Sequence, residues 1–442
     1  MRKLISKLLT QETKNKLHKI EAKFAVARHG HPASRIKVIG VTGTKGKTSV
    51  CNMIASILDE AGIKNAMETT INTKIGSEYT AHTRKDRWVT TPPSSVIQKF
   101  LKKAVKNDCK YAILEVTSQA IDQNRIYGID FDILIYTNLS HDHLEYHGTR
   151  EKYLDAKLKV FRDNPKAKFI VNMDDQYWNK FYSLPSSEKF LYSVKKMVDH
   201  GAVARKILTG PSESTFTAAF DDGQKTVHLN IPGVFNIQNA LAAFCTGLAL
   251  EIDPEKIKTG LENIDLISGR MESIRVSKKQ DFTVIIDYAH NPDSLKNVYE
   301  TVLDGMKNTG GRLITVLGAT GRRDKTKRPI MGALAGRYAD LVIFTNEDPY
   351  DEDPIAIMEQ TAEGIHRGAR KKNQWRLNRN YWKVLDRTQA IHKALREAEK
   401  NDVVMITGKG AEEVMAVGLD KFIPFSDRKV VKEELKKIYP GE

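Results

Sequence analysis

The chain has 442 residues, of which 40% are hydrophobic and 28% charged. This is the balance of an ordinary globular protein with room for two or three domains. It has no apolar run near the ~20 residues that a membrane-spanning helix needs, which excludes an integral membrane protein. The basic N-terminus is interrupted by Lys7 and followed by Glu12, so we expect no secretory signal and a cytoplasmic protein. Cys51, Cys109 and Cys245 are far apart, and we expect reduced, half-buried thiols.

The formal net charge of +15 has two interpretations. It is compatible with nucleic-acid binding, and equally with a solvated basic surface that attracts small anions such as nucleotides. The lysines are dispersed along the sequence, and no basic motif is interleaved with aromatic residues. We therefore expect a basic surface without nucleic acid as a partner.

In chain order, the first predicted element is helical. Leu4, Ile5, Leu8 and Leu9 stand at helical spacing, which predicts a short helical segment within residues 1–34. We expect this segment to dock on the next domain, with a membrane-surface helix as the alternative.

From residue 35 onward, β-branched runs alternate with helical periodicity, which predicts a parallel sheet with crossover helices. The predicted strands are Ile36–Ile39, Tyr111–Val116, Ile133–Thr137, Phe169–Asn172, Thr283–Asp287, Leu313–Leu317, Leu341–Thr345 and Val403–Thr407.

The residues between the fourth and fifth of these strands show a different sequence pattern. Residues 215–220 and 226–231 alternate around Asp222-Gly223, which predicts an antiparallel hairpin inserted as a flap. A helix is predicted from Asn236 to Leu250, and helical periodicity stops near residues 267–270. We therefore predict an α/β chain in three parts: a helical segment (1–34), a central parallel-sheet domain with the flap (35–268) and a Rossmann-like C-terminal domain (269–442).

The strongest motif is the stretch Gly40–Thr48, which follows the first strand and opens a helix. Strand, glycine loop, Lys-Thr and helix is the context of a nucleotide phosphate loop, in which backbone N–H groups and the helix N-terminus bind phosphate. Lys47 would reach the terminal phosphates and Thr48 would hold Mg²⁺. The sequence therefore predicts a P-loop-type ATPase domain with ATP and Mg²⁺ as cofactors. The predicted ATP contacts in the loop are Gly43, Thr44, Lys45, Gly46, Lys47 and Thr48.

A second pattern points to a metal. Glu115 ends a predicted strand and His143 lies in a later loop, and both residue types are ligands for divalent cations.

The glycine spacing of the loop, Gly-x-x-Gly-Thr-x-Gly-Lys-Thr, resembles the Mur ligase and folylpolyglutamate synthase superfamily. The segments Glu115-Val-Thr-Ser-Gln119, Tyr136–Gly148 and Tyr153–Lys157 follow in Mur ligase order. The resemblance implies that Glu115 and His143 bind a second Mg²⁺ and that Lys157 is carbamylated, because an anion there supports a metal whereas an ammonium repels it. Lys159 is a rival for that role, while His141 and His147 are interpreted as loop residues.

Further motifs keep the family's order. For ATP the resemblance implies Asn236, Asn239, Arg270, Asp287 and His290. For the acceptor substrate it implies Thr90, Thr91, Thr117, Ser118, Gln123 and Arg125. For the incoming amino acid it implies Arg323, Glu347, Asp348, Tyr350, Gly408 and Glu412.

Two departures concern the amino acid. Tyr350 stands where family members that add diaminopimelate carry an arginine, and Ala411 replaces a histidine. The run around Tyr350 is acidic, which favours a side-chain ammonium and hence a lysine-like diamine over diaminopimelate.

The resemblance is closest to the members that add the third peptide residue. It implies an ADP-forming ligase that couples an amino acid to a UDP-N-acetylmuramoyl-dipeptide-type acceptor through an acyl phosphate, in peptidoglycan precursor synthesis. Few residues precede the first strand, so an acceptor without UDP stays open, as does a folylpolyglutamate-type or other peptide ligase. A nucleic-acid-binding ATPase is the alternative from another class. We expect a monomer.

Overall fold

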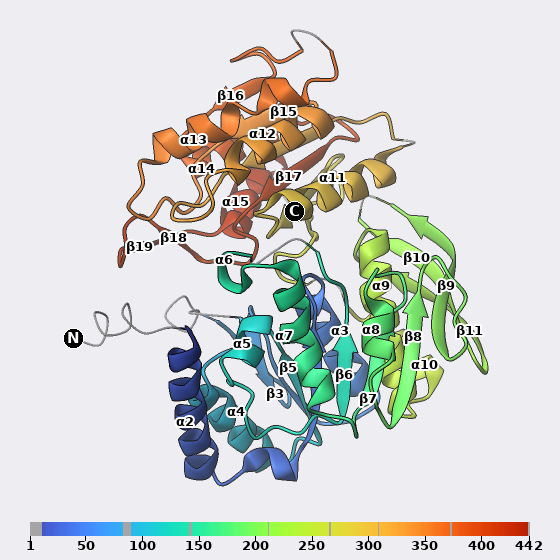
Figure 1. Cartoon of the computed structure of the whole chain (residues 1–442). Helices are drawn as coiled ribbons and strands as arrows, with labels where there is room; N and C mark the ends of the chain where they lie inside the picture. The colour runs from blue at the N-terminus through green and yellow to red at the C-terminus, as the bar shows by residue number, and fades with distance from the viewer. Residues whose placement is uncertain are drawn as a thin grey trace. The chain divides into compact units, whose positions relative to one another are not determined.

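The computed structural model describes residues 11–82, 90–140, 144–210, 212–264, 267–307, 309–371 and 374–440. The chain forms two compact units (Figure 1). Unit 1 holds most residues up to 264, and unit 2 holds residues 265 onward together with the short segments 208–214 and 229–234. No helix in the described part of the chain combines the length and apolar character needed to cross a membrane.

Unit 1 is built on one large sheet. Its strands are β1 (Lys37–Thr42), β2 (Asn65–Glu68), β3 (Asn72–Ile75), β4 (Glu78–Ala81), β5 (Tyr111–Glu115), β6 (Ile133–Tyr136), β7 (Lys168–Asn172), β8 (Glu188–Ser193), β9 (Gly201–Thr209), β10 (Ser214–Phe220) and β11 (Gly223–Leu229). They are ordered β11-β10-β9-β8-β7-β6-β1-β5-β2-β3-β4. The run from β9 to β2 is parallel, and β3 and β4 add an antiparallel extension at one edge.

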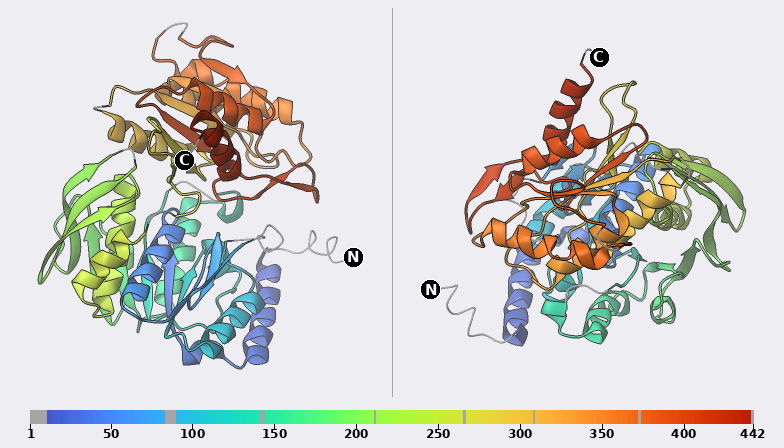
Figure 2. Two further views of the ribbon diagram at one scale, coloured as in Figure 1. Left: turned by 180° about the vertical axis from the view of Figure 1, so that it is seen from behind. Right: turned by 90° about the horizontal axis from the view of Figure 1, so that it is seen from above.

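Helices cover both faces of this sheet (Figures 1 and 2). They are α2 (Gln11–His29), η1 (Pro32–Arg35), α3 (Lys47–Glu60), α4 (Ser94–Lys106), α5 (Ser118–Asp122), α6 (Leu144–His147), α7 (Arg150–Arg162), α8 (Trp178–Tyr182), α9 (Val234–Ala249) and α10 (Pro254–Glu262). The helix α7 lies before the sheet in Figure 1, whereas α3 and α10 pack together and come forward in the view from behind.

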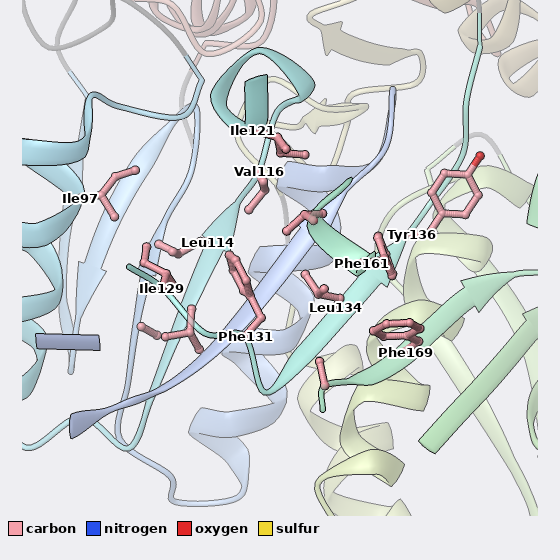
Figure 3. Packing of buried hydrophobic residues seen from close by; sticks show 14 of the residues in the cluster. Ile97, Leu114, Val116, Ile121, Ile129, Phe131, Leu134, Tyr136, Phe161 and Phe169 are labelled. Atoms are coloured by element: carbon pink, nitrogen blue, oxygen red, sulfur yellow. The ribbon is translucent and has the colours of Figure 1, made fainter. Parts of the chain in front are cut away.

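The central strands are buried along their length, as parallel strands covered on both faces must be. Apolar side chains of β5, β6 and β7 pack with those of α4 and α7 in one cluster, which Figure 3 shows around Phe131 and Leu134. Phe161 on α7 contacts Phe169 on β7 edge to face, with ring centroids 4.9 Å apart. This rigid core fixes the ends of β1, β5 and β6, where the candidate site lies.

Unit 2 contains a smaller α/β arrangement. Its strands are β12 (Glu272–Ile274), β13 (Thr283–Asp287), β14 (Leu313–Leu317), β15 (Leu341–Phe344), β16 (Tyr381–Lys383), β17 (Val403–Thr407), β18 (Val414–Ala416) and β19 (Phe422–Pro424). Its helices are α11 (Pro292–Met306), α12 (Lys327–Tyr338), α13 (Pro354–Ala362), η2 (Ile365–Gly368), α14 (Arg387–Glu397) and α15 (Asp427–Ile438). The main sheet has the order β12-β13-β17-β14-β15-β16, parallel except for β12, and β18 pairs with β19.

The predicted α/β class is confirmed, and each of the eight predicted parallel strands has its counterpart within a few residues. The predicted hairpin segments form the strands β10 and β11, which end the main sheet at one edge. The strands β2, β3 and β4 were not predicted. Cys51, Cys109 and Cys245 are free as expected, but buried rather than half-buried. The predicted helical residues 4–9 lie outside the described residues.

Candidate active site

The glycine-rich loop connects β1 directly to α3. Gly43 and Gly46 have positive φ angles of 148° and 84°. A Cβ atom on Gly43 would lie 1.9 Å from Thr137 Oγ1, and one on Gly46 would lie 2.3 Å from Asn239 Oδ1. Glycine is therefore required at both positions by backbone conformation and by space.

The segment after β6 supports the loop. The backbone N–H groups of Thr44 and Lys45 donate to the carbonyl and side-chain oxygens of Asn138, at 2.8 and 2.9 Å. The Thr44 hydroxyl accepts from the Ser140 N–H at 3.0 Å and lies 2.9 Å from the Tyr153 hydroxyl. The segment after β6 and the helix α7 thus hold the loop in one shape.

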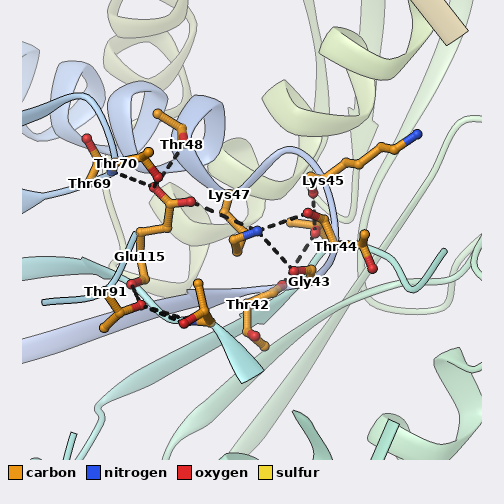
Figure 4. A network of polar contacts seen from close by, with 12 residues as sticks. Thr42, Gly43, Thr44, Lys45, Lys47, Thr48, Thr69, Thr70, Thr91 and Glu115 are labelled. Atoms are coloured by element: carbon orange, nitrogen blue, oxygen red, sulfur yellow. Dashed lines mark hydrogen bonds and ion pairs between the residues drawn. The ribbon is translucent and has the colours of Figure 1, made fainter. Parts of the chain in front are cut away.

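Two lysine side chains converge on one carbonyl oxygen of the loop. Lys47 Nζ donates to the carbonyls of Gly43 (3.1 Å) and Thr44 (2.9 Å). Lys157 Nζ, from α7, donates to the same Gly43 carbonyl at 2.8 Å. Lys45 points away from this group (Figure 4). Of the loop lysines, Lys47 is therefore the one aimed at the site.

Glu115, at the end of β5, is the anion at the centre of this network (Figure 4). It is 4% exposed, and its Oε2 accepts from the Thr48 hydroxyl and from the N–H and hydroxyl of Thr70, each at 2.9 Å. Its Oε1 lies 4.0 Å from Lys47 Nζ. The two residues chosen from separate motifs, Thr48 and Glu115, are thus in direct contact.

Lys157 is 1% exposed, and its Nζ lies 4.8 Å from the centre of the Tyr153 ring, one turn earlier on α7. Its rival Lys159 has a half-exposed side chain that pairs with Asp163 at the surface. Two ammonium groups on one carbonyl repel each other strongly in a buried site. A carbamate on Lys157 would keep one N–H for Gly43 and turn that repulsion into attraction.

The donors around Glu115 fit a magnesium ion. A hydroxyl and a carboxylate beside a phosphate loop are hard oxygen ligands of the kind Mg²⁺ prefers. Within the described ranges, no three His, Cys, Asp or Glu residues gather as a metal site. The third protein oxygen would come from a carbamate on Lys157. His143, like His141, lies outside the described residues.

The predicted acceptor residues gather beside Glu115. The Thr91 hydroxyl donates to the Glu115 carbonyl at 2.8 Å and lies 3.1 Å from the Thr117 hydroxyl. Arg125 donates through Nη1 to the Thr91 carbonyl at 2.7 Å and through Nε to Gln123 at 3.0 Å. Burial lowers the pKa of Arg125, yet a guanidinium stays charged at neutral pH.

Some of the predicted acceptor residues also have structural roles. The Thr117 hydroxyl caps α5 by accepting from the Ala120 N–H, and Thr91 is 2% exposed. Thr90, at the margin of the described residues, is partly exposed. These observations favour Gln123 and Arg125, which are partly exposed, for substrate contact over Thr117.

The sequence interpretation missed a role for His147. This residue is 8% exposed, and its Nε2 lies 2.9 Å from the Ser118 hydroxyl. Its ring contacts that of Tyr146 edge to face and lies beside Tyr153, which reaches Thr44 of the phosphate loop. It is therefore a packed residue between the acceptor group and the loop, and not a loop residue as predicted.

The predicted ATP residues fall into two sets, one in each unit. In unit 1, Asn236 and Asn239 are buried on α9, and Asn239 Nδ2 donates to Asn236 Oδ1 at 3.3 Å. In unit 2, Asp287 accepts from the N–H groups of Met271 and Ala289 at 2.8 and 2.7 Å. The other two predicted ATP residues belong to the same unit.

Arg270 and His290 both contact Tyr288. The Arg270 guanidinium lies over the Tyr288 ring, 4.7 Å from its centre, and His290 Nδ1 lies 2.9 Å from the Tyr288 carbonyl. Asp287, Arg270 and His290 therefore belong to one corner of unit 2, at the end of β13.

Two of the predicted amino-acid residues, Glu347 and Gly408, meet at the ends of β15 and β17. Gly408 has a φ of 106°, and a Cβ there would lie 2.2 Å from Glu347 Oε2. Glu347 is 3% exposed; its Oε1 accepts from Thr320, whereas its Oε2 has no hydrogen-bond partner among the described residues. Burial raises the pKa of Glu347, and Arg387 offsets this in part. This buried, half-satisfied carboxylate is suited to receive a donor from a ligand.

The charge argument for a lysine-like substrate is weaker than the sequence suggested. Lys409 donates to both carboxylate oxygens of Asp348, at 2.9 and 3.0 Å, and also pairs with Glu412. The next two acids are paired as well, Asp351 with Arg322 and Glu352 with Arg328. The acidic run is therefore largely neutralised within unit 2. Tyr350 has a positive φ of 54°, and Arg323 is exposed.

Replacing Gly46 by alanine tests the loop geometry. A left-handed backbone costs an L residue about 1–2 kcal/mol, and the added methyl group would also displace Asn239. Gly62 offers a matched control, since its φ is 71° and a Cβ there meets nothing within 4 Å. Gly46→Ala should lose more stability than Gly62→Ala in thermal unfolding, because only its methyl group meets Asn239, and only Gly46→Ala should raise the KM for ATP, by at least about tenfold. An equal KM for ATP in both variants would contradict the assignment of this loop as the phosphate loop.

Comparison with known proteins identifies the family of the chain. Residues 41–247 match the Mur ligase middle domain, and residues 269–410 match the Mur ligase glutamate ligase domain. The chain is 36% identical over 411 residues to UDP-N-acetylmuramoyl-L-alanyl-D-glutamate–2,6-diaminopimelate ligase of Clostridium tetani, covering 93% of this chain and 80% of that relative.

Solved structures give the same result. A structure of UDP-N-acetylmuramoyl-L-alanyl-D-glutamate–2,6-diaminopimelate ligase has a TM-score of 0.65 and 28% identity, and covers 92% of this chain and 79% of its own. The folylpolyglutamate synthase of Mycobacterium tuberculosis has a TM-score of 0.66 over 95% of both chains, but its 15% identity shows a shared fold alone. With both domain models matched in order and a relative more than a third identical over most of its length, the chain belongs to the Mur ligase family of ATP-dependent amide-bond-forming ligases.

Proposed function

We propose that this ligase joins a diamino acid to the terminal carboxylate of a UDP-N-acetylmuramoyl-dipeptide acceptor, in the cytoplasm and as a monomer. The observation that carries the proposal is the convergence of Lys47 and Lys157 on the Gly43 carbonyl, beside the Glu115–Thr48 pair. With Lys157 as a carbamate, that arrangement places the Lys47 ammonium and the metal donors where a terminal phosphate would lie.

The proposed reaction has two steps. An oxygen of the acceptor carboxylate attacks the γ-phosphorus of ATP, and ADP leaves as the bond to the β-phosphate breaks. The amine of the amino acid then attacks the acyl carbon, loses a proton and expels inorganic phosphate. Lys47 stabilises the charge of the transferring phosphoryl group, while Arg125 and Gln123 orient the acceptor.

Magnesium is the proposed metal, held by Thr48, Glu115 and a carbamate on Lys157, and when bound it neutralises phosphate charge. His143 is proposed as a further ligand. Asn236, Asn239, Arg270, Asp287 and His290 are proposed to bind the nucleotide.

The proposed amino-acid site contains Glu347, Asp348, Gly408 and Glu412, with Arg323 beside them. Its partner is a diamino acid, and the names of the relatives point to diaminopimelate. Tyr350 in place of an arginine points instead to lysine, which has no distal carboxylate to bind.

The deciding experiment combines the enzyme with ATP, Mg²⁺, UDP-N-acetylmuramoyl-dipeptide and single amino acids, followed by mass spectrometry of the product. We expect phosphate release only when acceptor and a diamino acid are both present. Phosphate release with acceptor but without any coupled product would contradict the amino-acid assignment alone. No ADP formation with the acceptor, whichever amino acid is present, would reject the acceptor.

Changing Tyr350 to arginine should shift specificity. A guanidinium at this position supplies a planar donor pair for the distal carboxylate of diaminopimelate. A hydrogen bond to a charged group contributes about 1.5–3 kcal/mol, so the ratio of kcat/KM for diaminopimelate over lysine should rise at least about tenfold. Tyr350→Phe is the control, because it should leave the ratio unchanged. An equal change of this kcat/KM ratio in both variants would show that the side chain at position 350 does not discriminate between the two amino acids.

A further inference from the structure

The helix α2 has two apolar faces, of which one packs on other described residues of unit 1. On the inner face, Ala22, Ala25 and Val26 are buried, and the helix packs on α4. The Val26 side chain is so close to Gly128 that a Cβ there would lie 2.8 Å from it. This inner face accounts for the docking of the helix.

The outer face carries large apolar side chains in solvent. Leu17, Ile20 and Phe24 are 48%, 52% and 73% exposed. At 100° per residue they fall within about 60° of one another, opposite the buried alanines. The helix lies at the outer edge of unit 1 in Figures 1 and 2. An aligned row of exposed Leu, Ile and Phe indicates a surface that contacts something else.

Cations line one side of this row, and the exposed Glu21 lies on the other. Lys19 and Lys23 are exposed along one side of it, and Arg28 is exposed beyond Phe24. The helices α2 and α4 together carry only two carboxylates, Glu12 and Glu21. Their basic side chains are Lys14, Lys16, Lys19, Lys23, Arg28, Lys99, Lys102, Lys103 and Lys106.

The cations of α4 extend the same basic area. Lys99 and Lys102 are exposed, and both lie near the end of α2. Burial lowers the pKa of His29, and the charges of Lys102, Arg28 and Lys99 lower it further. The fold thus gathers lysines that are far apart in the sequence, where they had appeared dispersed.

We propose that the face formed by Leu17, Ile20 and Phe24, with its flanking lysines, is a docking surface for an anionic lipid membrane. An apolar row beside a line of cations is typical of helices that lie in a membrane interface, with apolar side chains among the acyl chains and cations at the headgroups. This inference concerns residues outside the proposed ligase site and is independent of its substrates.

Two other occupants fit the surface less well. A second copy of the chain, related by a twofold axis, would bring the two basic flanks together and repel. A nucleic acid would use the lysines but would leave the apolar row in water. Only an anionic lipid surface satisfies both parts of the pattern.

The test measures binding of the whole chain to vesicles by flotation. The probe is phosphatidylglycerol vesicles, with phosphatidylcholine vesicles for comparison. The apolar variant is Ile20→Ser with Phe24→Ser, and its matched control is Tyr182→Ser with Met197→Ser, which are 37% and 66% exposed elsewhere in unit 1. The charge variant is Lys19→Glu with Lys23→Glu, and its control is Lys166→Glu with Lys180→Glu.

We expect the wild type and both controls to bind phosphatidylglycerol, more weakly at high salt, and to bind phosphatidylcholine little. The apolar and charge variants should each lose binding by at least about tenfold, with unchanged thermal stability and ligase rate. Three outcomes would overturn the proposal. They are no vesicle binding by the wild type, equal binding by the apolar variant, and a wild-type dimer in light scattering that the apolar variant abolishes.

Discussion

Lys157→Ala should lower kcat by roughly 10²–10³, the size of effect seen when one group that stabilises a transition-state charge is removed. The side chain is buried against the phosphate loop and shares the Gly43 carbonyl with Lys47. If its active form is a carbamate, the alanine variant lacks an anion rather than a cation. Short carboxylic acids such as acetate or propionate should therefore restore part of the rate, whereas small amines should not.

The matched control is Lys159→Ala, two residues along α7. Lys159 is exposed and pairs with Asp163, so its loss should change stability and rate by no more than about 0.5 kcal/mol. Wild-type enzyme freed of carbon dioxide should lose activity and regain it with bicarbonate. Rescue of Lys157→Ala by amines instead of acids would assign an ammonium to this position and remove the carbamate from the mechanism.

The sequence predicted best those features that depend on local pattern. Strands β1, β5, β13 and β17 are short apolar runs bounded by loops, as expected for parallel strands that are buried on both faces. The phosphate loop was also predictable, because the Gly-Lys-Thr signature needs only the neighbouring strand and helix. The contact between Thr48 and Glu115 follows from the adjacency of β1 and β5.

Features that depend on contacts distant in sequence were not predictable. The strands β2, β3 and β4 are short and polar, and each is stabilised by its neighbours. The acidic run after β15 looked like a negative pocket because its cationic partner Lys409 lies 61 residues away. His147 looked like a loop residue because only the fold brings Ser118 to its ring.

The second large effect is expected from the pair Arg387–Asp427 in unit 2. Both side chains are fully buried, and two parallel hydrogen bonds of 2.8 Å join them. Asp427→Asn should cost about 3–5 kcal/mol, because it leaves a buried guanidinium without its counter-charge. Glu397→Gln, which removes the exposed partner of Lys393, is the control and should cost at most about 0.5 kcal/mol.

The same pair should also control amino-acid binding. The Arg387 guanidinium donates to the carbonyls of Thr407 (2.8 Å) and Asn346 (3.4 Å), which directly precede Gly408 and Glu347. Loosening it should raise the KM for the amino acid at least about tenfold, since about 1.4 kcal/mol is enough for such a change, with little effect on the KM for the acceptor. Replacing both partners, as Arg387→Met with Asp427→Leu, should recover stability relative to Asp427→Asn, because no unpaired charge remains. It should not recover amino-acid binding, since methionine cannot donate to either carbonyl. Recovery of both properties together would show that the pair contributes charge balance alone and does not position the two loops.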